Sequence, residues 1–317
     1  MPRFKDYVPQ GVIPATLAAF DTDFEFDWAE TRRHLAFAAD ADGVTAVTVN
    51  GHASEVHACT VDEQARMLDE AGAEIGDRMP LIAGVYADGS HEAARIAKMA
   101  AAHGASALLC FPPASMGMGL IRRRPEMGIA HMKTVAEATD LPIIVFQYSN
   151  ELGYPLDTLV RICEEVDSVV AIKDWSPPQV HDEHIRTLHA LPRRIGVLST
   201  NSAWLMSSLV MGADGLLSGA GSVIADLQSA LFRAVRAKDL GAAQALADRI
   251  YLTTRVFYSD PFGDMHNRMK EALVLLGRLG GPAVVRPPLM KLTEREIARI
   301  AEAMTAAGIA RDGALGL

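Results

Sequence analysis

Short runs of apolar residues recur along the whole chain, and each is followed by a longer stretch in which apolar and polar positions mix. Most of the short runs are continuous, as expected for strands that are buried on both faces of a parallel sheet. Eight of them are predicted strands: residues 11–18, 44–50, 80–86, 107–111, 142–148, 169–174, 195–199 and 215–218. Their alternation with helical stretches predicts eight repeated βα units.

The stretches between the predicted strands have the features of helices. Residues 61–75 place apolar and charged side chains at helical spacing, and residues 91–103 are rich in alanine and follow Ser90, a suitable N-cap. Eight parallel strands joined by right-handed crossovers close most economically into a (β/α)8 TIM barrel. An open, doubly wound α/β sheet is the alternative.

Only helical patterns follow Val223. The candidate helices cover residues 225–238, 240–257, 265–279 and 293–307. We therefore expect residues 1–224 to form the barrel with the active site. Residues 225–317 are expected to supply the last barrel helix and a C-terminal α-helical extension.

Composition narrows the class of protein. Half of the 317 residues are hydrophobic and 22% are charged, which is typical of a globular protein with a large core. The net charge of −9 argues against partners such as nucleic acid or an anionic membrane. Three cysteines without a CxxC pair, no signal-peptide pattern and no apolar run of about 18 residues favour a cytoplasmic location.

The polar residues that end the predicted strands are the candidates for chemistry, because TIM-barrel active sites lie at the carboxyl ends of the strands. Lys173 follows the apolar run Val-Val-Ala-Ile at the end of the sixth strand. Burial disfavours the charged amine, lowers its pKa and frees the lone pair for attack on a carbonyl. An ion pair with Asp174 or Glu164 is the structural alternative, and the local sequence leaves both open.

A short polar loop, residues 50–55, follows the second strand. Gly51 permits close approach to the backbone, and the amides of His52, Ala53 and Ser54 are expected to cradle a carboxylate. His52 is a candidate acid or base, and a solvated histidine without a catalytic role is the alternative.

The fifth strand ends in Phe146, Gln147 and Tyr148. Residues two apart in a strand share a face, so Phe146 and Tyr148 are expected to face the same way and Gln147 the opposite way. Tyr148 offers a phenol that can relay protons if it faces the barrel mouth, and simple aromatic packing is the alternative.

Taken together, these motifs resemble those of one family, the dihydrodipicolinate synthase and N-acetylneuraminate lyase family of Schiff-base lyases, over nearly the whole chain. The segments that carry the resemblance are GVIPA at 11–15, GHASE at 51–55, TVDE at 60–63, LPIIVF at 141–146, VAIKD at 170–174, GADGLLSG at 212–219 and RPPL at 286–289.

The resemblance implies a barrel in which the lysine of the sixth strand, here Lys173, forms an imine with pyruvate or a related 2-oxo acid. It implies no cofactor and no metal, and it implies a homotetramer. Ser218 and Gly219, which end the eighth strand, are expected to contribute to substrate binding.

The chain departs from the family pattern at several positions, which marks it as a divergent member. Phe146 aligns with the family's proton-relaying tyrosine, and a phenylalanine transfers no proton. Tyr148 or His52 is expected to replace it. Ala53 stands where the family has a threonine that holds the substrate carboxylate, which leaves backbone amides and Ser54 for that role.

Further departures concern the second substrate. Glu151 lies near the position of an arginine that grips this substrate in the lysine-pathway synthase, and the loop at 111–119 lacks that enzyme's tyrosine. A carboxylate would repel an anionic substrate, so the lysine-pathway reaction itself is not expected. A more apolar second-substrate pocket is suggested by Phe111, Met116, Met118 and Trp175.

We therefore predict a cofactor-independent lyase, an aldolase or a hydro-lyase, that acts on a 2-oxo acid together with an aldehyde or a sugar acid. A 2-keto-3-deoxy sugar acid dehydratase is one alternative. A barrel that binds 2-oxo acids but has lost turnover is another, motivated by Phe146 and Ala53. A metal site is not expected, because the spacing of His181, His184 and His189 indicates a solvated helix face.

Overall fold

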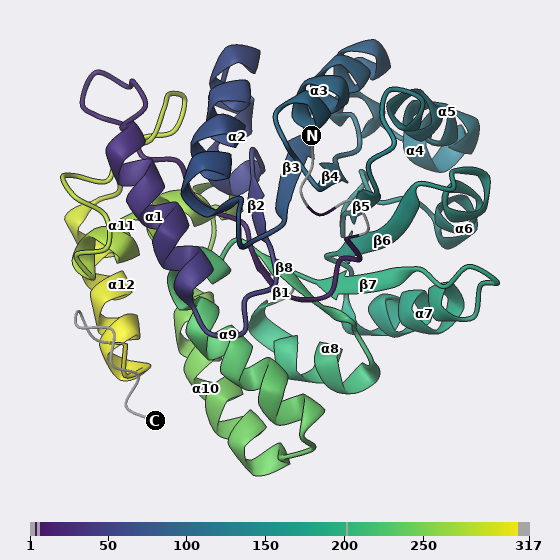
Figure 1. The fold of residues 1–317 in the computed structure, drawn as a ribbon. Coiled ribbons are helices and arrows are strands. Elements are labelled where there is room, and N and C mark those ends of the chain that lie inside the picture. Colours follow the sequence, from purple (N-terminus) through teal and green to yellow (C-terminus); the bar gives the residue numbers. More distant parts are fainter. Residues whose placement is uncertain (1–3, 5–6, 201, 310–317) are drawn as a thin grey trace.

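Eight parallel strands form a single sheet at the centre of the molecule, with helices around it (Figure 1). The computed structural model describes residue 4, residues 7–200 and residues 202–309. The strands follow the order β1-β8-β7-β6-β5-β4-β3-β2. Their bounds are β1 Gly11–Pro14, β2 Val47–Val49, β3 Leu81–Val85, β4 Ala107–Cys110, β5 Ile143–Gln147, β6 Val169–Asp174, β7 Gly196–Ser199 and β8 Gly215–Ser218.

Contacts between the two ends of this sheet close it into a barrel. The amide of Thr45 donates to the carbonyl of Val12 at 2.9 Å, and the amide of Thr16 donates to the carbonyl of Thr48 at the same distance. These bonds join β1 to the strand region that contains β2. The predicted (β/α)8 TIM barrel is therefore confirmed, and the open sheet is excluded as an alternative.

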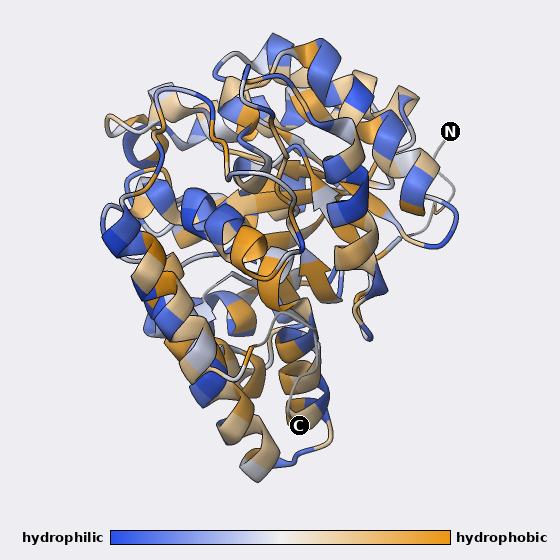
Figure 2. Cartoon of the chain, turned by 90° about the vertical axis from the view of Figure 1, so that its left-hand side faces the viewer, coloured by the Kyte–Doolittle hydropathy of each residue, from blue (hydrophilic) through white to orange (hydrophobic). Residues whose placement is uncertain are grey.

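Helices occupy every interval between successive strands and the chain after β8. The barrel helices are α1 Trp28–Asp40, α2 Val61–Ile75, α3 Ser90–Ala102, α4 Leu120–Arg123, α5 Pro125–Ala136, α6 Leu156–Glu165, α7 Pro178–His189, α8 Leu205–Met211 and α9 Gly221–Arg236. Every described residue of the strands except the half-buried Val170 is buried, and Figure 2 shows the hydrophobic residues gathered on the inner elements.

The C-terminal extension consists of α10 Leu240–Phe257, α11 Met265–Leu275 and α12 Glu294–Ala306, with the short 3₁₀ helix η5, Phe262–Asp264, before α11. It packs against α9 through α10 and α11. The expected boundary at residue 224 falls inside α9, at Ile224, where the backbone leaves the helical region with φ −126° and ψ 34°. In the described part of the chain, no helix is long and apolar enough to cross a membrane.

Candidate active site

A cavity of about 310 Å³ lies at the carboxyl ends of the barrel strands. Its wall combines residues from β5 and β6, from the loop after β2 and from the extension. The lining includes seven of the nine residues predicted to form the site, namely Gly51, His52, Ala53, Phe146, Tyr148, Lys173 and Gly219. Most of the predicted site residues therefore gather around one cavity at this end of the barrel.

Lys173 is the amine of this cavity. Its side chain ends β6 and the residue is only 7% exposed. Burial lowers the pKa of Lys173 from its ordinary value of 10.5 to about 7. The ammonium nitrogen lies 4.1 Å from the centre of the Phe146 ring, and no acidic side chain of the described residues pairs with it. The structural alternative, an ion pair of Lys173 with Asp174 or Glu164, is therefore not found among the described residues.

Asp174 is instead held on the opposite side of β6 by two histidines. Its Oδ2 accepts hydrogen bonds from Nδ1 of His181 and of His184, each at 2.8 Å, and its Oδ1 accepts from the amide of Ser176 at 2.9 Å. Burial acts to raise the pKa of Asp174, but the two histidine bonds outweigh it and hold that pKa well below its ordinary value.

The prediction that His181 and His184 mark a solvated helix face is therefore wrong. Both side chains are buried on the inner face of α7, where they hold the carboxylate of the residue next to Lys173. His189, one turn further on, bonds Asp214 at 2.9 Å. Among the described residues, no group of three or more histidine, cysteine, aspartate or glutamate side chains is arranged to hold a metal ion.

Among the described residues, a contact between His52 and Tyr148 joins the loop after β2 to the end of β5. His52 Nε2 and the Tyr148 hydroxyl lie 2.5 Å apart. Burial, and then the nearby charge of Lys173, lower the pKa of His52 to about 3, and burial raises the pKa of Tyr148 above its ordinary value. Both groups are therefore neutral at pH 7, and the hydroxyl and the ring nitrogen share a hydrogen bond.

The facing of the β5 residues agrees with the prediction. Phe146 and Tyr148 both line the cavity, with ring centres 4.3 Å apart. Gln147 points away from it and bonds the backbone of Tyr154 at 2.9 Å and 3.0 Å. Phe146 therefore supplies a ring surface beside Lys173 but no hydroxyl.

The loop after β2 is held in one conformation by its backbone. Asn50 and Glu55, at its two ends, have positive φ values of 55° and 54°, and the Asn50 side chain donates to the carbonyl of Gln64 at 2.9 Å. A Cβ on Gly84 of β3 would lie 1.9 Å from the Asn50 carbonyl, so only glycine allows this close approach.

Two amides of the 3₁₀ helix η1, His52–Ser54, belong to residues that line the cavity. The amides of His52 and Ala53 donate to no group in the part of the chain that the structure describes. The amide of Ser54 donates to the carbonyl of Gly51 at 3.0 Å, and its hydroxyl to the carbonyl of Thr16 at 2.7 Å. Ser54 therefore has both donors engaged inside the protein.

Ser218 also differs from the expected arrangement. Its hydroxyl lies 3.1 Å from that of Ser202 and accepts from the Gln228 side chain at 3.3 Å, outside the cavity lining. Of the apolar residues suggested for the second-substrate pocket, Trp175 lines the cavity. Phe111 does not line the cavity but packs against His52, with ring centres 4.6 Å apart. Met118 also lies outside the lining and is 84% exposed.

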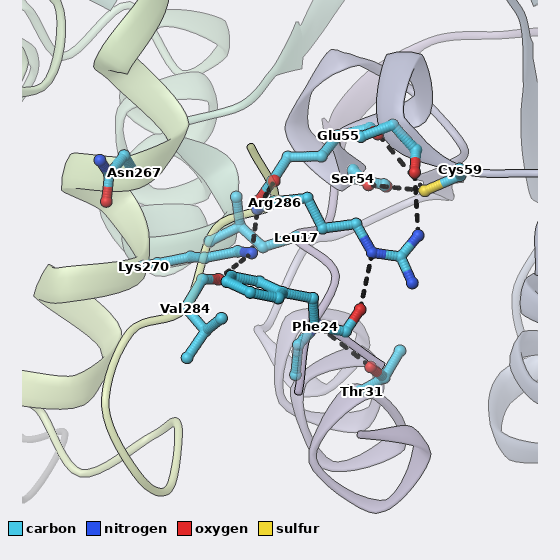
Figure 3. Close-up of polar contacts among 12 residues, drawn as sticks. Leu17, Phe24, Thr31, Ser54, Glu55, Cys59, Asn267, Lys270, Val284 and Arg286 are labelled. Atoms are coloured by element: carbon cyan, nitrogen blue, oxygen red, sulfur yellow. Dashed lines mark hydrogen bonds and ion pairs between the residues drawn. The ribbon is translucent and has the colours of Figure 1, made fainter. Parts of the chain in front are cut away.

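A buried ion pair joins the loop after β2 to the extension (Figure 3). Glu55 pairs with Lys270 of α11, and its second oxygen accepts from the Arg286 amide at 2.9 Å. Lys270 also donates to the carbonyl of Val284 at 2.7 Å. The Arg286 guanidinium binds Glu63 of α2 at 2.6 Å and 2.9 Å. Burial lowers the pKa of Lys270, which the charge of Glu55 counteracts.

The extension also contributes cavity residues that the sequence did not indicate: Tyr258, Phe262, Met265 and His266. Burial, followed by the charges of neighbouring basic groups, lowers the pKa of His266 well below its ordinary value, so its imidazole is neutral. A turn with two aromatic residues, YSDPFG at 258–263, was the only available signal, and nothing in it points to the barrel mouth.

Comparison with known proteins agrees with this geometry. The model of the dihydrodipicolinate synthetase family matches residues 8–307. The 4-hydroxy-tetrahydrodipicolinate synthase of Kineococcus radiotolerans is 32% identical over 275 residues, which are 84% of this chain and 83% of that protein. The N-acetylneuraminate lyase of Rhizobium meliloti is 29% identical and the alignment covers 93% of this chain and 94% of the lyase.

Two further similarities bear on activity and fold. A protein named as a probable 5-dehydro-4-deoxyglucarate dehydratase, from Rhizobium rhizogenes, is 28% identical over 95% of this chain and 96% of its own. The crystal structure of dihydrodipicolinate synthase from Aquifex aeolicus superposes with a TM-score of 0.83 at 23% identity, covering 95% of this chain and 99% of that one. The chain belongs to the dihydrodipicolinate synthetase family, as a divergent member, and is a lyase.

Proposed function

We propose that the chain is a Schiff-base-forming lyase in which Lys173 forms an imine with pyruvate or a related 2-oxo acid. The observation that carries this proposal is the buried, unpaired amine of Lys173 in a cavity at the carboxyl end of the barrel, with a pKa lowered to about 7. At neutral pH a large fraction of this amine is uncharged and can attack a carbonyl.

The reaction begins when the neutral amine adds to the C2 carbonyl of the 2-oxo acid and water leaves, which forms a protonated imine. In a 4-hydroxy-2-oxo acid, the C4 hydroxyl then loses its proton and the C3–C4 bond breaks. The bonding electrons pass to the imine as an enamine, and an aldehyde leaves. Protonation at C3 and hydrolysis release pyruvate and free Lys173.

Proton transfer in these steps is assigned to the His52 and Tyr148 pair. Both groups are neutral, they lie 2.5 Å apart, and both line the cavity with Lys173. This pair takes the part of the tyrosine that Phe146 replaces, because a hydroxyl and an imidazole in contact can carry a proton in either direction.

The substrate carboxylate is assigned to the amides of His52 and Ala53. These two donors belong to cavity-lining residues at the start of η1 and have no acceptor within the described residues. Backbone amides of consecutive residues form anion-binding concavities. Their use compensates for the missing hydroxyl at Ala53.

The lysine-pathway synthase reaction is not the activity that we propose. Among the described residues, the cavity lining holds no arginine, and no lysine besides Lys173. An anionic aldehyde would therefore lack a counter-ion, and Glu151 brings a further negative charge near the position expected for that counter-ion.

Dehydration of a 2-keto-3-deoxy sugar acid is the second candidate, and it is favoured by the similarity to the Rhizobium rhizogenes protein. The same imine acidifies the C3 proton, so that loss of a hydroxyl from C4 becomes possible without cleavage. Product analysis separates the two reactions, because dehydration keeps the carbon skeleton and cleavage yields pyruvate with an aldehyde.

The homotetramer implied by the resemblance stays a prediction, to be checked by sedimentation.

Borohydride trapping tests the proposal. The protein is incubated with pyruvate, reduced with borohydride, digested and analysed by mass spectrometry, with Lys98→Met as a control because Lys98 is exposed on α3. We expect one reduced adduct, on Lys173, which Lys98→Met retains and Lys173→Met loses. An adduct on another residue, or none with any of a panel of 2-oxo acids, would refute Schiff-base chemistry at this site.

A further inference from the structure

Five aromatic rings form one continuous side of the cavity, which we call the aromatic wall: Phe146, Tyr148, Trp175, Phe262 and Tyr258. Phe262 stacks on Trp175 with ring centres 4.7 Å apart and planes 16° apart, and on Tyr258 at 5.8 Å and 24°. Trp175 meets Tyr148 edge-on at 5.9 Å, and Tyr148 lies 4.3 Å from Phe146. The wall thus runs from Lys173 outward to the rim.

The outer part of the aromatic wall has ring surface available to a ligand. Trp175, Tyr258 and Phe262 are only partly buried, although each lines the cavity. Aromatic rings associate by offset stacking or by edge-to-face contact, and the wall contains both geometries already. A planar ring that enters the cavity can therefore extend the wall in either way.

The charges of the cavity select against an anionic second substrate. Glu55 is the acidic group of the lining, and it is engaged by Lys270 and the Arg286 amide. Lys173 is consumed by the imine. The amides of His52 and Ala53 suffice for one carboxylate, which is that of the 2-oxo acid. A second carboxylate would be desolvated beside rings, with no described lysine or arginine to pair with it.

The size of the cavity limits the second substrate as well. Its volume of about 310 Å³ lies at the low end of the range of about 300 to 1,000 Å³ that is typical of small-molecule sites. Two small reactants fit this space: a three-carbon 2-oxo acid at Lys173 and a single ring against the outer wall.

We propose that the second-substrate subsite, formed by Trp175, Tyr258 and Phe262, takes an uncharged aromatic aldehyde. This inference rests on the function proposed above. In the condensation direction, C3 of the pyruvate enamine attacks the aldehyde carbon, a carbon–carbon bond forms and the aldehyde oxygen takes up a proton. Water then hydrolyses the imine, which releases a 4-aryl-4-hydroxy-2-oxobutanoate and restores the amine of Lys173.

The test compares three aldehydes with pyruvate as the common donor: benzaldehyde, succinic semialdehyde and glyceraldehyde. Condensation is followed by chromatography, and kcat/KM for benzaldehyde is expected to exceed that for either other aldehyde by roughly tenfold or more. Equal values, a preference for the anionic or the sugar-like aldehyde, or no turnover of benzaldehyde would overturn the inference.

Trapping of the pyruvate adduct in the same samples separates the two proposals. An adduct on Lys173 without a preference for benzaldehyde overturns the aromatic subsite alone. Absence of the adduct overturns the Schiff-base function and, with it, the subsite.

Variants of the outer wall provide the second measurement. Phe262→Ala and Trp175→Ala are each expected to raise KM for benzaldehyde about five- to tenfold, with little change in the rate of pyruvate adduct formation. Tyr251→Ala is the control, because Tyr251 is 47% exposed on α10 and does not line the cavity. An unchanged KM in both wall variants, with native circular dichroism, would overturn the inference.

A positive charge placed on the aromatic wall should shift the preference from benzaldehyde toward the anionic aldehyde. Phe262→Arg is expected to raise kcat/KM for succinic semialdehyde and to lower it for benzaldehyde, because it supplies the counter-ion that the described lining lacks. If this variant shifts neither ratio while adduct formation is retained, Phe262 does not contact the second substrate and the subsite is wrongly located.

Discussion

The buried pair of Glu55 and Lys270 is expected to hold the loop after β2 in its working position. The side chains of the two residues are 1% and 0% exposed, respectively, and their contact links η1 to α11 (Figure 3). Lys270→Met keeps an unbranched apolar chain in the same space and removes the charge. Glu55→Gln keeps the shape of the side chain and removes the opposite charge.

The magnitude follows from what each variant leaves behind. In Lys270→Met, the Glu55 carboxylate keeps one hydrogen bond, from the Arg286 amide at 2.9 Å, and loses its cation. In Glu55→Gln, the Lys270 ammonium keeps the Val284 carbonyl at 2.7 Å and the Phe20 ring at 4.3 Å. Breaking a buried pair from either side costs about 3–5 kcal/mol, because the remaining charge is buried and unpaired.

The double variant leaves neither charge, so the two losses should not add. We expect a coupling free energy of at least about 2 kcal/mol from urea unfolding followed by circular dichroism. Lys133→Met is the matched control: Lys133 also pairs with a glutamate, Glu165, but the two side chains are 44% and 33% exposed, so the loss should stay below about 1 kcal/mol.

Two results would refute this reasoning. One is additivity of the single variants within about 0.5 kcal/mol, which would mean that the pair does not act as a unit. The other is a Lys270→Met protein no less stable than Lys133→Met. In addition, both single variants should raise KM for pyruvate, since Glu55 directly follows η1, whose amides are assigned to the carboxylate.

Three further predictions concern the reacting groups. Because burial lowers the pKa of Lys173 from 10.5 to about 7, the stability associated with its neutral form is present above pH 10.5 and is lost as the pH falls to about 7. Lys173→Met should therefore be more stable than the wild type at pH 6, by roughly 3–5 kcal/mol in urea unfolding, and equal midpoints at that pH would contradict the shift. The initial rate of pyruvate adduct formation, measured by quenched borohydride trapping, should rise with pH and level off above about 7, and a rate that keeps rising to pH 10 would contradict it. Tyr148→Phe should slow turnover roughly a hundredfold in steady-state assays, whereas the control variant Tyr86→Phe should not. Adding Phe146→Tyr to Tyr148→Phe should restore part of the rate. Full activity of Tyr148→Phe would exclude Tyr148 from the relay.

The barrel could be predicted from the regular recurrence of apolar runs, because each strand that is buried on both faces requires its own continuous run of apolar residues. The predicted strands at 169–174 and 215–218 coincide with β6 and β8, and the predicted helix at 240–257 coincides with α10. The predicted strand at 11–18 was too long, since β1 ends at Pro14 while the chain stays buried to Phe20. Apolar character reports burial, whereas a strand ends where its ladder of hydrogen bonds ends.

The parts of the site that sequence could not supply depend on contacts between distant segments. Helical spacing shows that His181 and His184 share a face of α7, but it does not show whether that face turns toward the core or toward solvent. The side chain that holds both histidines toward the core is Asp174, which lies on β6. The cavity residues Tyr258 and Phe262 follow Lys173 by a long stretch of chain and lie in a turn. No local pattern connects such a turn with the barrel mouth.

The barrel and the C-terminal extension contribute different parts of the cavity. In the proposed function, the barrel side of the cavity supplies the amine and the proton relay, through Lys173, Tyr148 and the loop that bears His52, whereas the extension supplies Phe262 and Tyr258. Imine formation then needs only the residues of the barrel side, and recognition of the aldehyde needs the residues of the extension. Substitutions in η5 should therefore change which aldehyde is used while the pyruvate adduct still forms, and substitution of Lys173 should abolish both, because every later step proceeds from the imine.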